Sequence, residues 1–298
     1  MPIPESQLDT WSHQGSVAQS STTYKSVKGV LEATDTPYAN RSYTSFLQGS
    51  YGNDTNVWAD SDVDIVMRID SVFYRDIEDL PADEKALYKV AFSDATYYYA
   101  DFKQDVIAVL KKAYGDAVDP GNKAIFIAGN GTRRDVDVLV AAQFRKYRRF
   151  RSHTDQDYVE GICFWDGEGK QIINYPKQHS ANCTTKHQGS AQRFKPTVRI
   201  LKNMRNAMIS DGYLSDGSAP SYYLEGMLYN VPASCFGTSW QDTVTAAINW
   251  LNEADQKKLL CANEQYFLLH PPSKVTWREE QFAAYLKAVI KYWNEWYQ

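Results

Sequence analysis

The segment from Gln48 to Val66 constrains this chain more than any other. It reads QGSYGNDTNVWADSDVDIV, so a Gly49-Ser50 pair is followed by Asp62 and Asp64 at alternate positions. A tight glycine–serine turn presents backbone N–H groups and a hydroxyl, which suit phosphate oxygens. Aspartates two residues apart on a strand leave the same face, with Cα atoms roughly 6.6 Å apart. Two such carboxylates beside this turn predict a site for paired Mg²⁺ ions and phosphoryl or nucleotidyl transfer.

The residues around these aspartates favour a strand that packs on a core. Apolar side chains occupy every second position, at Val63, Ile65, Met67 and Ile69. An alternation with one continuous apolar face is typical of a half-buried strand. The alternative, a solvated edge strand with two surface aspartates, is therefore disfavoured.

A second alternating segment, residues 134–140, supplies further carboxylates. Its valines share one face, while Asp135 and Asp137 share the other. A third carboxylate from a neighbouring strand would complete the shell of a metal ion that activates a hydroxyl nucleophile. Taken alone, the pair would indicate a plain surface strand. Coupled to the upstream motif it favours metal binding, and the alternation leaves open whether Asp135 or Asp137 is the ligand.

Composition limits the class of protein. The chain has 298 residues, of which 43% are hydrophobic, which suffices for one large domain or two lobes. It contains no apolar run of membrane-spanning length and no signal-peptide pattern at Met1–Glu5, so neither is predicted. The four scattered cysteines fit a reduced, cytoplasmic setting. A net charge of −4 argues against a protein that grips long nucleic acid.

Two short segments depart from this acidic balance. Arg133-Arg134 and the run from Arg145 to Arg151 are rich in basic residues. The longer run could contact triphosphates or a short nucleic acid, but a solvated strand explains it equally well.

The periodicities predict a mixed α+β fold, with a sheet first and helices after it. Strands are expected at residues 43–48, 62–69, 124–128, 134–140, 160–165 and 171–174. Helices are expected at about 16–32, within 83–114, and at 195–209, 222–229, 241–251 and 279–296. In the 83–114 segment the expected apolar stripe includes Leu87, Val90, Phe102, Val106 and Leu110. We predict a catalytic lobe at 1–190, in which the first helix bridges the lobes, a helical lobe at 191–298, and a cleft between them.

At this point the motifs resemble a known family. Gly49-Ser50, Ser61–Asp64 and residues 136–141 resemble the three-carboxylate pattern of the DNA polymerase β-like nucleotidyltransferases. More narrowly, with segments 175–182, 193–203 and 221–225, nearly the whole chain resembles the bacterial cGAS/DncV-like nucleotidyltransferases. The resemblance implies a polymerase β-like fold. It also implies synthesis of cyclic di- or trinucleotide messengers from ribonucleoside triphosphates such as ATP, GTP or UTP. In this family the products serve anti-phage (CBASS) signalling and are read by a separate effector protein.

The resemblance also assigns roles to single residues. Asp62 and Asp64 would ligate two Mg²⁺ ions, for which Mn²⁺ can substitute, and Asp137 would ligate the catalytic ion and help deprotonate the attacking hydroxyl. The nucleotide-binding residues implied are Gly49 and Ser50 for the β- and γ-phosphates, Lys202 and Ser221 for the triphosphate, and Tyr222 for stacking on the donor base. Without the resemblance, Lys202 would be predicted on a solvated helix face and Tyr222 in the core or at its rim.

His179, Cys183 and His187 have the spacing of metal ligands on one helix face. Because no fourth ligand is evident, a structural zinc is disfavoured. Residues 179–182 are instead interpreted as a loop over the bases, with Asn182 as a candidate for base selection. The animal DNA-sensing relative carries a zinc-bearing insertion that this chain lacks, which, together with the acidic balance, argues against DNA as an activator.

The expected reaction is in-line attack of a ribose hydroxyl on an α-phosphate, with release of pyrophosphate. Ring closure by the linear intermediate follows from the resemblance only. Two alternatives remain: a nucleotidyltransferase that modifies RNA or a small molecule without cyclising, and a catalytically silent nucleotide sensor. The second is disfavoured because all three aspartates are present. The sequence leaves base identity, ring size and linkage open.

Overall fold

The computed structural model describes residues 2–15, 17–57 and 62–296. It separates into two compact units that interleave along the chain. The helical unit comprises Met1–Val17, Gly49–Ser61 and Lys177–Gln298, and the sheet unit comprises Ala18–Gln48 and Asp62–Pro176. The sequence prediction had placed a single boundary after residue 190. Each unit is described by itself.

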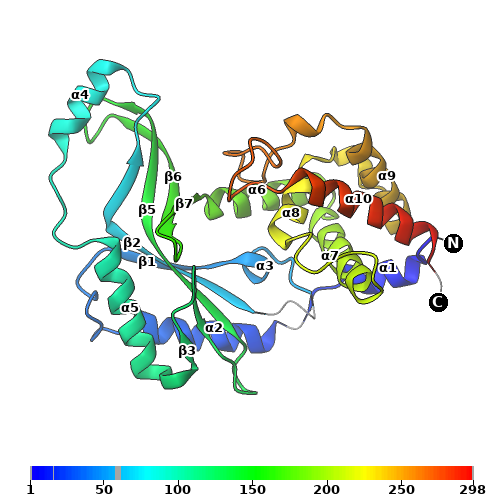
Figure 1. The fold of residues 1–298 in the computed structure, drawn as a ribbon, viewed down its shortest axis with the longest axis horizontal. Coiled ribbons are helices and arrows are strands. Elements are labelled where there is room, and N and C mark those ends of the chain that lie inside the picture. Colours follow the sequence, from blue (N-terminus) through cyan, green and yellow to red (C-terminus); the bar gives the residue numbers. More distant parts are fainter. Residues whose placement is uncertain (1, 16, 58–61, 297–298) are drawn as a thin grey trace. The chain divides into compact units, whose positions relative to one another are not determined.

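A seven-stranded mixed sheet forms the centre of the sheet unit (Figure 1). Its strands are β1 (Tyr43–Gln48), β2 (Val63–Asp76), β3 (Val118–Asp119), β4 (Ile125–Ile127), β5 (Val136–Phe150), β6 (Gln156–Trp165) and β7 (Gln171–Asn174). The order is β1-β2-β5-β4-β3, and β6 pairs with β5 and with β7. Only β2 and β5 run parallel among these pairs, and the others are antiparallel. The expected strands are confirmed, and β2 and β5 extend well beyond their predicted ends.

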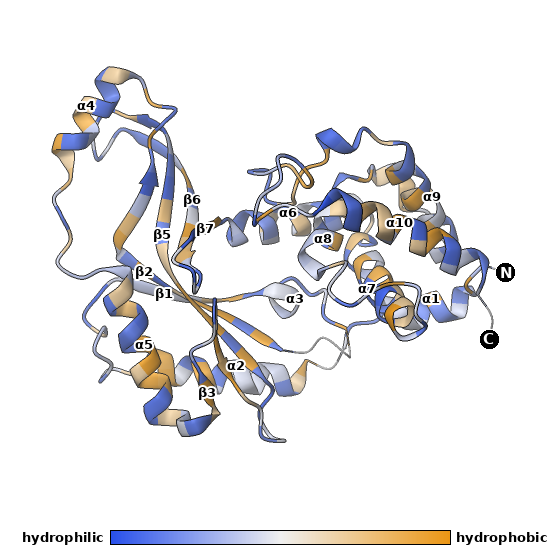
Figure 2. Ribbon diagram, in the orientation of Figure 1, coloured by the Kyte–Doolittle hydropathy of each residue, from blue (hydrophilic) through white to orange (hydrophobic). Residues whose placement is uncertain are grey.

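The core of this unit lies where the alternation predicted it. Val63, Ile65, Met67 and Ile69 on β2 are fully buried, as are Val136 and Val138 on β5. Two helices, α2 (Ala18–Leu31) and α5 (Tyr99–Tyr114), pack against each other and against the sheet. Figure 2 shows the hydrophobic residues along β2 and β5 and on α5. A 3₁₀ turn, η1 (Gly115–Ala117), follows α5.

One predicted apolar stripe is partly wrong. Phe102 and Leu110 on α5 are buried, but Leu87 and Val90 on α4 (Ala82–Ala91) are 45% and 84% exposed. The prediction ran one stripe across 83–114, whereas α4 and α5 are separate helices with non-helical residues between them. A helical period does not carry its phase across such a break. Instead, α4 buries Tyr88 and Glu84.

A second, smaller core explains why the strands are longer than expected. Leu80 and Tyr88 pack with Tyr147 and Phe150 of β5, and Phe73 of β2 packs against this group. Strands need an apolar surface to cover one face, and this cluster supplies it for the distal halves of β2 and β5.

The helical unit is built around α7. Its helices are α1 (Glu5–Ser12), α3 (Gly49–Gly52), α6 (Pro176–Gly189), α7 (Phe194–Ser210), α8 (Ser221–Asn230), α9 (Trp240–Glu253) and α10 (Glu279–Asn294), with 3₁₀ turns η2 (Ala233–Cys235) and η3 (Gln256–Lys258). The core includes Leu201 and Met204 of α7, Leu224 of α8, Leu251 of α9 and Phe282 of α10. The four helices predicted after residue 190 are confirmed. In the described part of the chain, no helix has the length and apolar character that a bilayer span requires.

Candidate active site

Three aspartates of the sheet unit converge through strand register. Asp62 immediately precedes β2, Asp64 is the second residue of β2, and the parallel pairing sets Asp64 opposite Asp137 of β5. Residues paired in register on neighbouring strands project to the same face, and adjacent strands lie about 4.8 Å apart. Asp64 and Asp137 are half-buried, whereas Val63 and Val136 beside them are fully buried. The register therefore brings together carboxylates that lie more than seventy positions apart in the sequence.

The electrostatics of this face favour the binding of a cation. Burial raises the pKa of Asp137, and the carboxylates of Asp62 and Asp135 raise it further. Like charges at short range disfavour ionisation of each other, and a cation among them reverses that effect. Carboxylate oxygens are the ligands that Mg²⁺ prefers. The residues present therefore fit a divalent cation held by Asp62, Asp64 and Asp137.

The structure distinguishes Asp135 from Asp137. One carboxylate oxygen of Asp135 accepts a hydrogen bond from the Gly129 backbone N–H at 2.6 Å. Asp135 also precedes β5, and its carbonyl accepts from the Val63 N–H at 3.0 Å. Asp137 is the residue paired with Asp64. This arrangement favours Asp137 as the third carboxylate and gives Asp135 a structural role in the turn.

The Gly49-Ser50 turn belongs to the helical unit. Gly49 adopts φ of 67°, a left-handed conformation that favours glycine, and begins the four-residue helix α3. The turn is closed by the segment that follows it: the Asn53 N–H donates to the Gly49 carbonyl at 3.1 Å, and the Thr55 N–H donates to the Ser50 carbonyl at 2.9 Å. Ser61 of the predicted motif lies outside the described residues.

Lys202 lies in an environment that the sequence did not predict. Its side chain is fully buried, and its Nζ donates to the Thr55 carbonyl at 3.1 Å. On the same face of α7, Lys195 forms an ion pair with Asp54 at 2.9 Å, and Arg199 donates to the Asp54 carbonyl at 2.6 Å. Because these three cations are spaced by four and three residues, they line one helix face. The solvated helix face is wrong for Lys202, and α7 instead contacts Asp54 and Thr55.

The remaining predicted nucleotide-binding residues lie on α6 and α8, and each contacts another protein group. The Ser221 hydroxyl accepts from Arg205 at 3.1 Å, and Asn182 donates to the Ala262 carbonyl at 2.8 Å. The Tyr222 ring stacks on His179, with ring centroids 4.8 Å apart and planes 20° apart. Residues 179–182 are helical, so the predicted loop over the bases is wrong. The nucleotide roles of Ser221, Tyr222 and Asn182 stay predictions.

The histidine–cysteine cluster does not form the metal site that its spacing suggested. His179 and Cys183 approach Glu225 of α8, while His187 lies apart and its Nδ1 accepts from the Lys195 N–H at 3.4 Å. Nε2 of His179 and Oε2 of Glu225 are 2.5 Å apart, which is a direct hydrogen bond. Ligands on either side of a zinc ion bind it at about 2.0–2.2 Å each, so this contact leaves no room for the ion.

Glu225 is the functional candidate that the sequence reasoning missed. It is 3% exposed, between buried Leu224 and buried Gly226. A single acidic residue within an otherwise apolar helical segment was the available signal, because buried charges occur where partners satisfy them. The polar residues Asn53 and Thr55, directly after the Gly49-Ser50 turn, are two of those partners.

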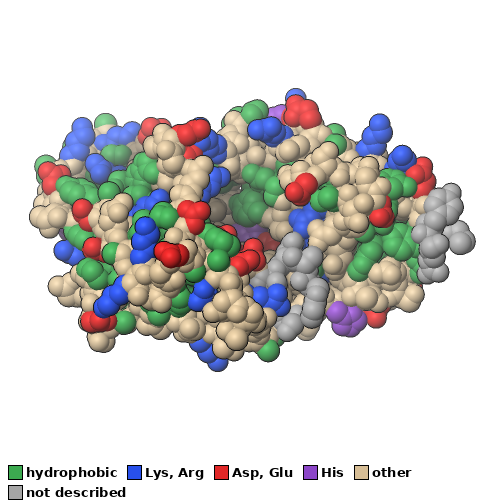
Figure 3. All heavy atoms as spheres, turned by 60° about the horizontal axis from the view of Figure 1, so that its bottom comes forward, with side chains coloured by type: hydrophobic (Ala, Val, Ile, Leu, Met, Phe, Trp, Pro, Cys, Tyr) green, Lys and Arg blue, Asp and Glu red, His purple; other side chains and the backbone are tan. Residues whose placement is uncertain are grey.

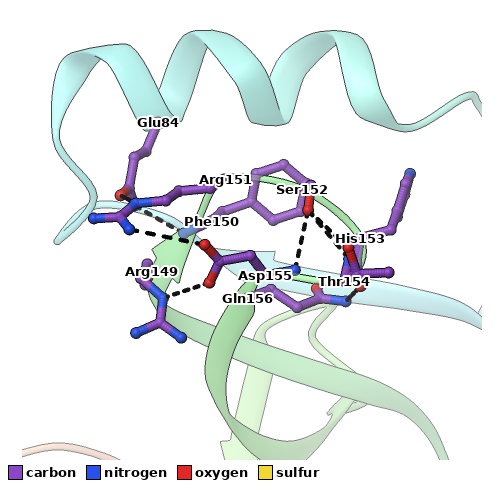
Figure 4. Close-up of polar contacts among 9 residues, drawn as sticks. All are labelled: Glu84, Arg149, Phe150, Arg151, Ser152, His153, Thr154, Asp155 and Gln156. Atoms are coloured by element: carbon purple, nitrogen blue, oxygen red, sulfur yellow. Dashed lines mark hydrogen bonds and ion pairs between the residues drawn. The ribbon is translucent and has the colours of Figure 1, made fainter.

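The basic run is a locally neutralised strand. Arg149 pairs with Asp155 at 3.0 Å, and Arg151 pairs with Glu84 at 3.4 Å and with Asp155 at 3.8 Å (Figure 4). The Arg145 guanidinium lies 3.8 Å from the centre of the Phe73 ring. On the face drawn in Figure 3, basic and acidic side chains are interspersed. These contacts favour the solvated strand over a polyanion-binding surface.

Comparison with known proteins agrees with the fold. The model of the cGAS/DncV-like nucleotidyltransferase C-terminal helical domain matches residues 181–294. The cyclic UMP-AMP synthase of Rhodothermus marinus is 39% identical and spans 100% of both chains. The cyclic nucleotide synthase CdnE01 of Staphylococcus haemolyticus is 35% identical over 99% of this chain and 100% of its own length. The solved structure of R. marinus CdnE c-UMP-AMP synthase with Apcpp and Upnpp has a TM-score of 0.89 and 38% identity, covering 100% of this chain and 98% of that one.

These findings define the class of enzyme as a nucleotidyltransferase with a mixed sheet and a helical C-terminal region. Within that class, the chain belongs to the cGAS/DncV-like nucleotidyltransferases. The family resemblance, the fold class and the enzyme class expected from the sequence are thereby confirmed.

Proposed function

We propose that this enzyme makes a cyclic di- or trinucleotide second messenger from ribonucleoside triphosphates by two-metal nucleotidyl transfer. The observation that carries the proposal is the in-register pairing of Asp64 with Asp137 beside Asp62, with the pKa of Asp137 raised by burial and by its acidic neighbours. Full-length similarity to a cyclic UMP-AMP synthase supports cyclisation and makes ATP with UTP the first substrate pair to test. The proposal places the enzyme in the cytoplasm, in anti-phage signalling, with a separate effector as reader of the product.

In the proposed reaction a ribose hydroxyl oxygen bonds to the α-phosphorus of a donor triphosphate, and the bond to pyrophosphate breaks. The hydroxyl proton passes to the carboxylate of Asp137, the half-buried residue that the strand register sets opposite Asp64. Two Mg²⁺ or Mn²⁺ ions held by Asp62, Asp64 and Asp137 would neutralise the charge that develops on the phosphoryl oxygens. A second transfer of the same kind within the linear intermediate closes the ring.

The proposed nucleotide contacts divide between direct and indirect roles. The Gly49-Ser50 turn holds the β- and γ-phosphates, and Ser221, Tyr222 and Asn182 contact the remaining triphosphate and the base. The burial of Lys202 supports an indirect role, in which its charge fixes the segment after the turn. The local ion pairs of residues 145–151 favour a nucleotide substrate over a long RNA acceptor.

The test is product analysis. Purified protein is incubated with the four ribonucleoside triphosphates and Mg²⁺ or Mn²⁺, treated with phosphatase, and examined by mass spectrometry. The matched control is the Asp62→Asn, Asp64→Asn double variant. A phosphatase-resistant cyclic product that the control does not make supports the proposal and identifies the bases. Linear products only, or transfer to added RNA, would contradict cyclisation, and no product under either metal would contradict the proposed reaction for the isolated chain.

A further inference from the structure

Glu225 lies at the centre of a buried polar network within the helical unit. Its Oε2 accepts from the Asn53 side-chain amide at 3.0 Å and lies 2.5 Å from His179 Nε2. Its Oε1 accepts from the Thr55 hydroxyl. These donors come from α6 and from the segment after α3, so one carboxylate joins elements that are distant in the sequence.

The groups around this carboxylate favour its ionised form. Burial by itself raises the pKa of Glu225, but the hydrogen bond and charge of His179, the Thr55 hydroxyl and the charge of Lys202 outweigh burial and lower it. A buried carboxylate whose acceptors are occupied by fixed donors is held in one orientation. Glu225 thus remains ionised as a rigid acceptor within the helical unit.

The network ends at the phosphate-binding turn. Thr55 donates its backbone N–H to the Ser50 carbonyl at 2.9 Å, and Asn53 donates its backbone N–H to the Gly49 carbonyl at 3.1 Å. The same two residues donate their side chains to Glu225. Asn53 and Thr55 therefore each link Glu225 to the turn. Their side chains bind the Glu225 carboxylate, and their backbone N–H groups bind the carbonyls of Gly49 and Ser50.

The network also reaches the predicted base-binding residue. His179 contacts Glu225 through Nε2, and its ring stacks on Tyr222. A ring held by a hydrogen bond to a fixed carboxylate offers a fixed surface to its stacking partner. Contacts of Glu225 therefore connect the turn, through Asn53 and Thr55, with Tyr222, through His179.

We propose that Glu225 is a positioning residue for the nucleoside triphosphate, which fixes the Gly49-Ser50 turn through Thr55 and Asn53 without touching the substrate. This inference rests on the proposed function of that turn in binding triphosphates. It predicts that loss of the carboxylate weakens substrate binding while the reacting aspartates remain intact. Preorganised donors cost no ordering when the ligand binds, so loosening them lowers affinity.

The experiment compares Glu225→Gln and Thr55→Val with Val289→Ala. Val289 is a buried residue of α10 that contributes to the same core and takes no part in the network. We would measure the Kd of the α,β-methylene analogue of ATP by calorimetry, KM and kcat for product synthesis, and the melting temperature. Glu225→Gln should raise the Kd and KM about tenfold and change kcat less than about threefold. Val289→Ala should lower the melting temperature and leave the Kd within about twofold of the wild-type value.

Two further comparisons decide the outcome. Because Glu225 acts on the turn through the Thr55 hydroxyl, the double variant Glu225→Gln, Thr55→Val should bind the analogue about as weakly as Glu225→Gln alone. The inference is overturned if the Kd in Glu225→Gln equals that of the wild type, or rises no more than in Val289→Ala. Failure of the proposed function looks different: the wild type would make no nucleotide product, while the analogue titrations would still test whether Glu225 positions the turn.

Discussion

Asp137 of the sheet unit and Glu225 of the helical unit are both carboxylates withdrawn from water, and their pKa values move in opposite directions. The pKa of Asp137 is raised by burial and by the neighbouring Asp62 and Asp135. The pKa of Glu225 is lowered, because His179, Thr55 and Lys202 outweigh the effect of burial. The difference lies in the neighbours: one carboxylate faces like charges, and the other faces donors and cations. Donors and a cation of the protein surround the second carboxylate, while the first is the one for which we propose a bound divalent cation.

The largest expected effect is the loss of product synthesis when an aspartate of the sheet unit is replaced, and it should exceed any loss of synthesis caused by replacing Glu225. Asp64→Asn should lower product synthesis by about a thousandfold or more, since it removes one of the proposed metal ligands. Its melting temperature in EDTA should stay close to that of the wild type, because the substitution leaves the buried apolar residues of β2 unchanged. Steady-state kinetics and thermal melts measure both. A variant that retains activity, or that melts well below the wild type, would break the contrast with Glu225.

For the free energy of unfolding we expect the reverse order, with a larger loss on replacing Glu225 than on replacing Asp64. Glu225→Gln should lower the free energy of unfolding by about 3 kcal/mol, because an amide group replaces an acceptor for several buried donors. Urea unfolding of the wild type and of Glu225→Gln measures the difference in the free energy of unfolding. Val289→Ala serves as the control for a loss of packing alone. If the urea midpoint of Glu225→Gln equals that of the wild type, the hydrogen-bond network around Glu225 contributes no stability.

The stability difference between the wild type and Glu225→Gln should depend on pH, which tests whether the ionised carboxylate is the stabilising species. The ordinary pKa of a glutamate is 4.5, and in the folded protein the pKa of Glu225 is lower. The unfolded chain therefore binds more protons between these two values, so the stabilisation is present above pH about 4.5 and is lost as the pH falls through the folded pKa. Urea midpoints of the wild type and Glu225→Gln should converge in that acidic range. A gap that widens on acidification would show that the carboxylate is not the stabilising species.

Divalent cations should act on the sheet unit alone. Mg²⁺ that binds the folded aspartate site stabilises it by about 1.4 kcal/mol at ten times the Kd. The melting temperature should rise with Mg²⁺ in the wild type and in Glu225→Gln, and stay constant in Asp62→Asn, Asp64→Asn. A Mg²⁺ response that survives the loss of both aspartates would place the cation elsewhere.

The smallest effects are expected at the exposed ion pairs. The side chains of Arg149 and Asp155 are 48% and 44% exposed. Arg149→Ala should lower the free energy of unfolding by less than about 1 kcal/mol and leave product synthesis unchanged, because water and salt screen such pairs. Urea unfolding and product yield test this directly. A large loss of synthesis would restore a substrate role for the basic run.

Much of the sheet unit could be predicted from local pattern. Alternation predicted β1, β2 and the start of β5, because a strand buried on one face repeats every two residues. The pattern failed where a break reset the phase, as between Leu87 and Phe102. It also missed the distal core around Tyr147, because the residues that form it come from separate segments.

The sequence by itself determined the family, the strands that carry the aspartates and the glycine that the turn requires. Those features depend on residues close together in the chain or on motifs that keep their spacing. Only the tertiary structure decided that Asp137 is the residue paired with Asp64, that Lys202 is buried against Thr55, and that Glu225 supports the turn. Strand register and helix packing join residues that are remote in sequence, and no local period records which of them meet.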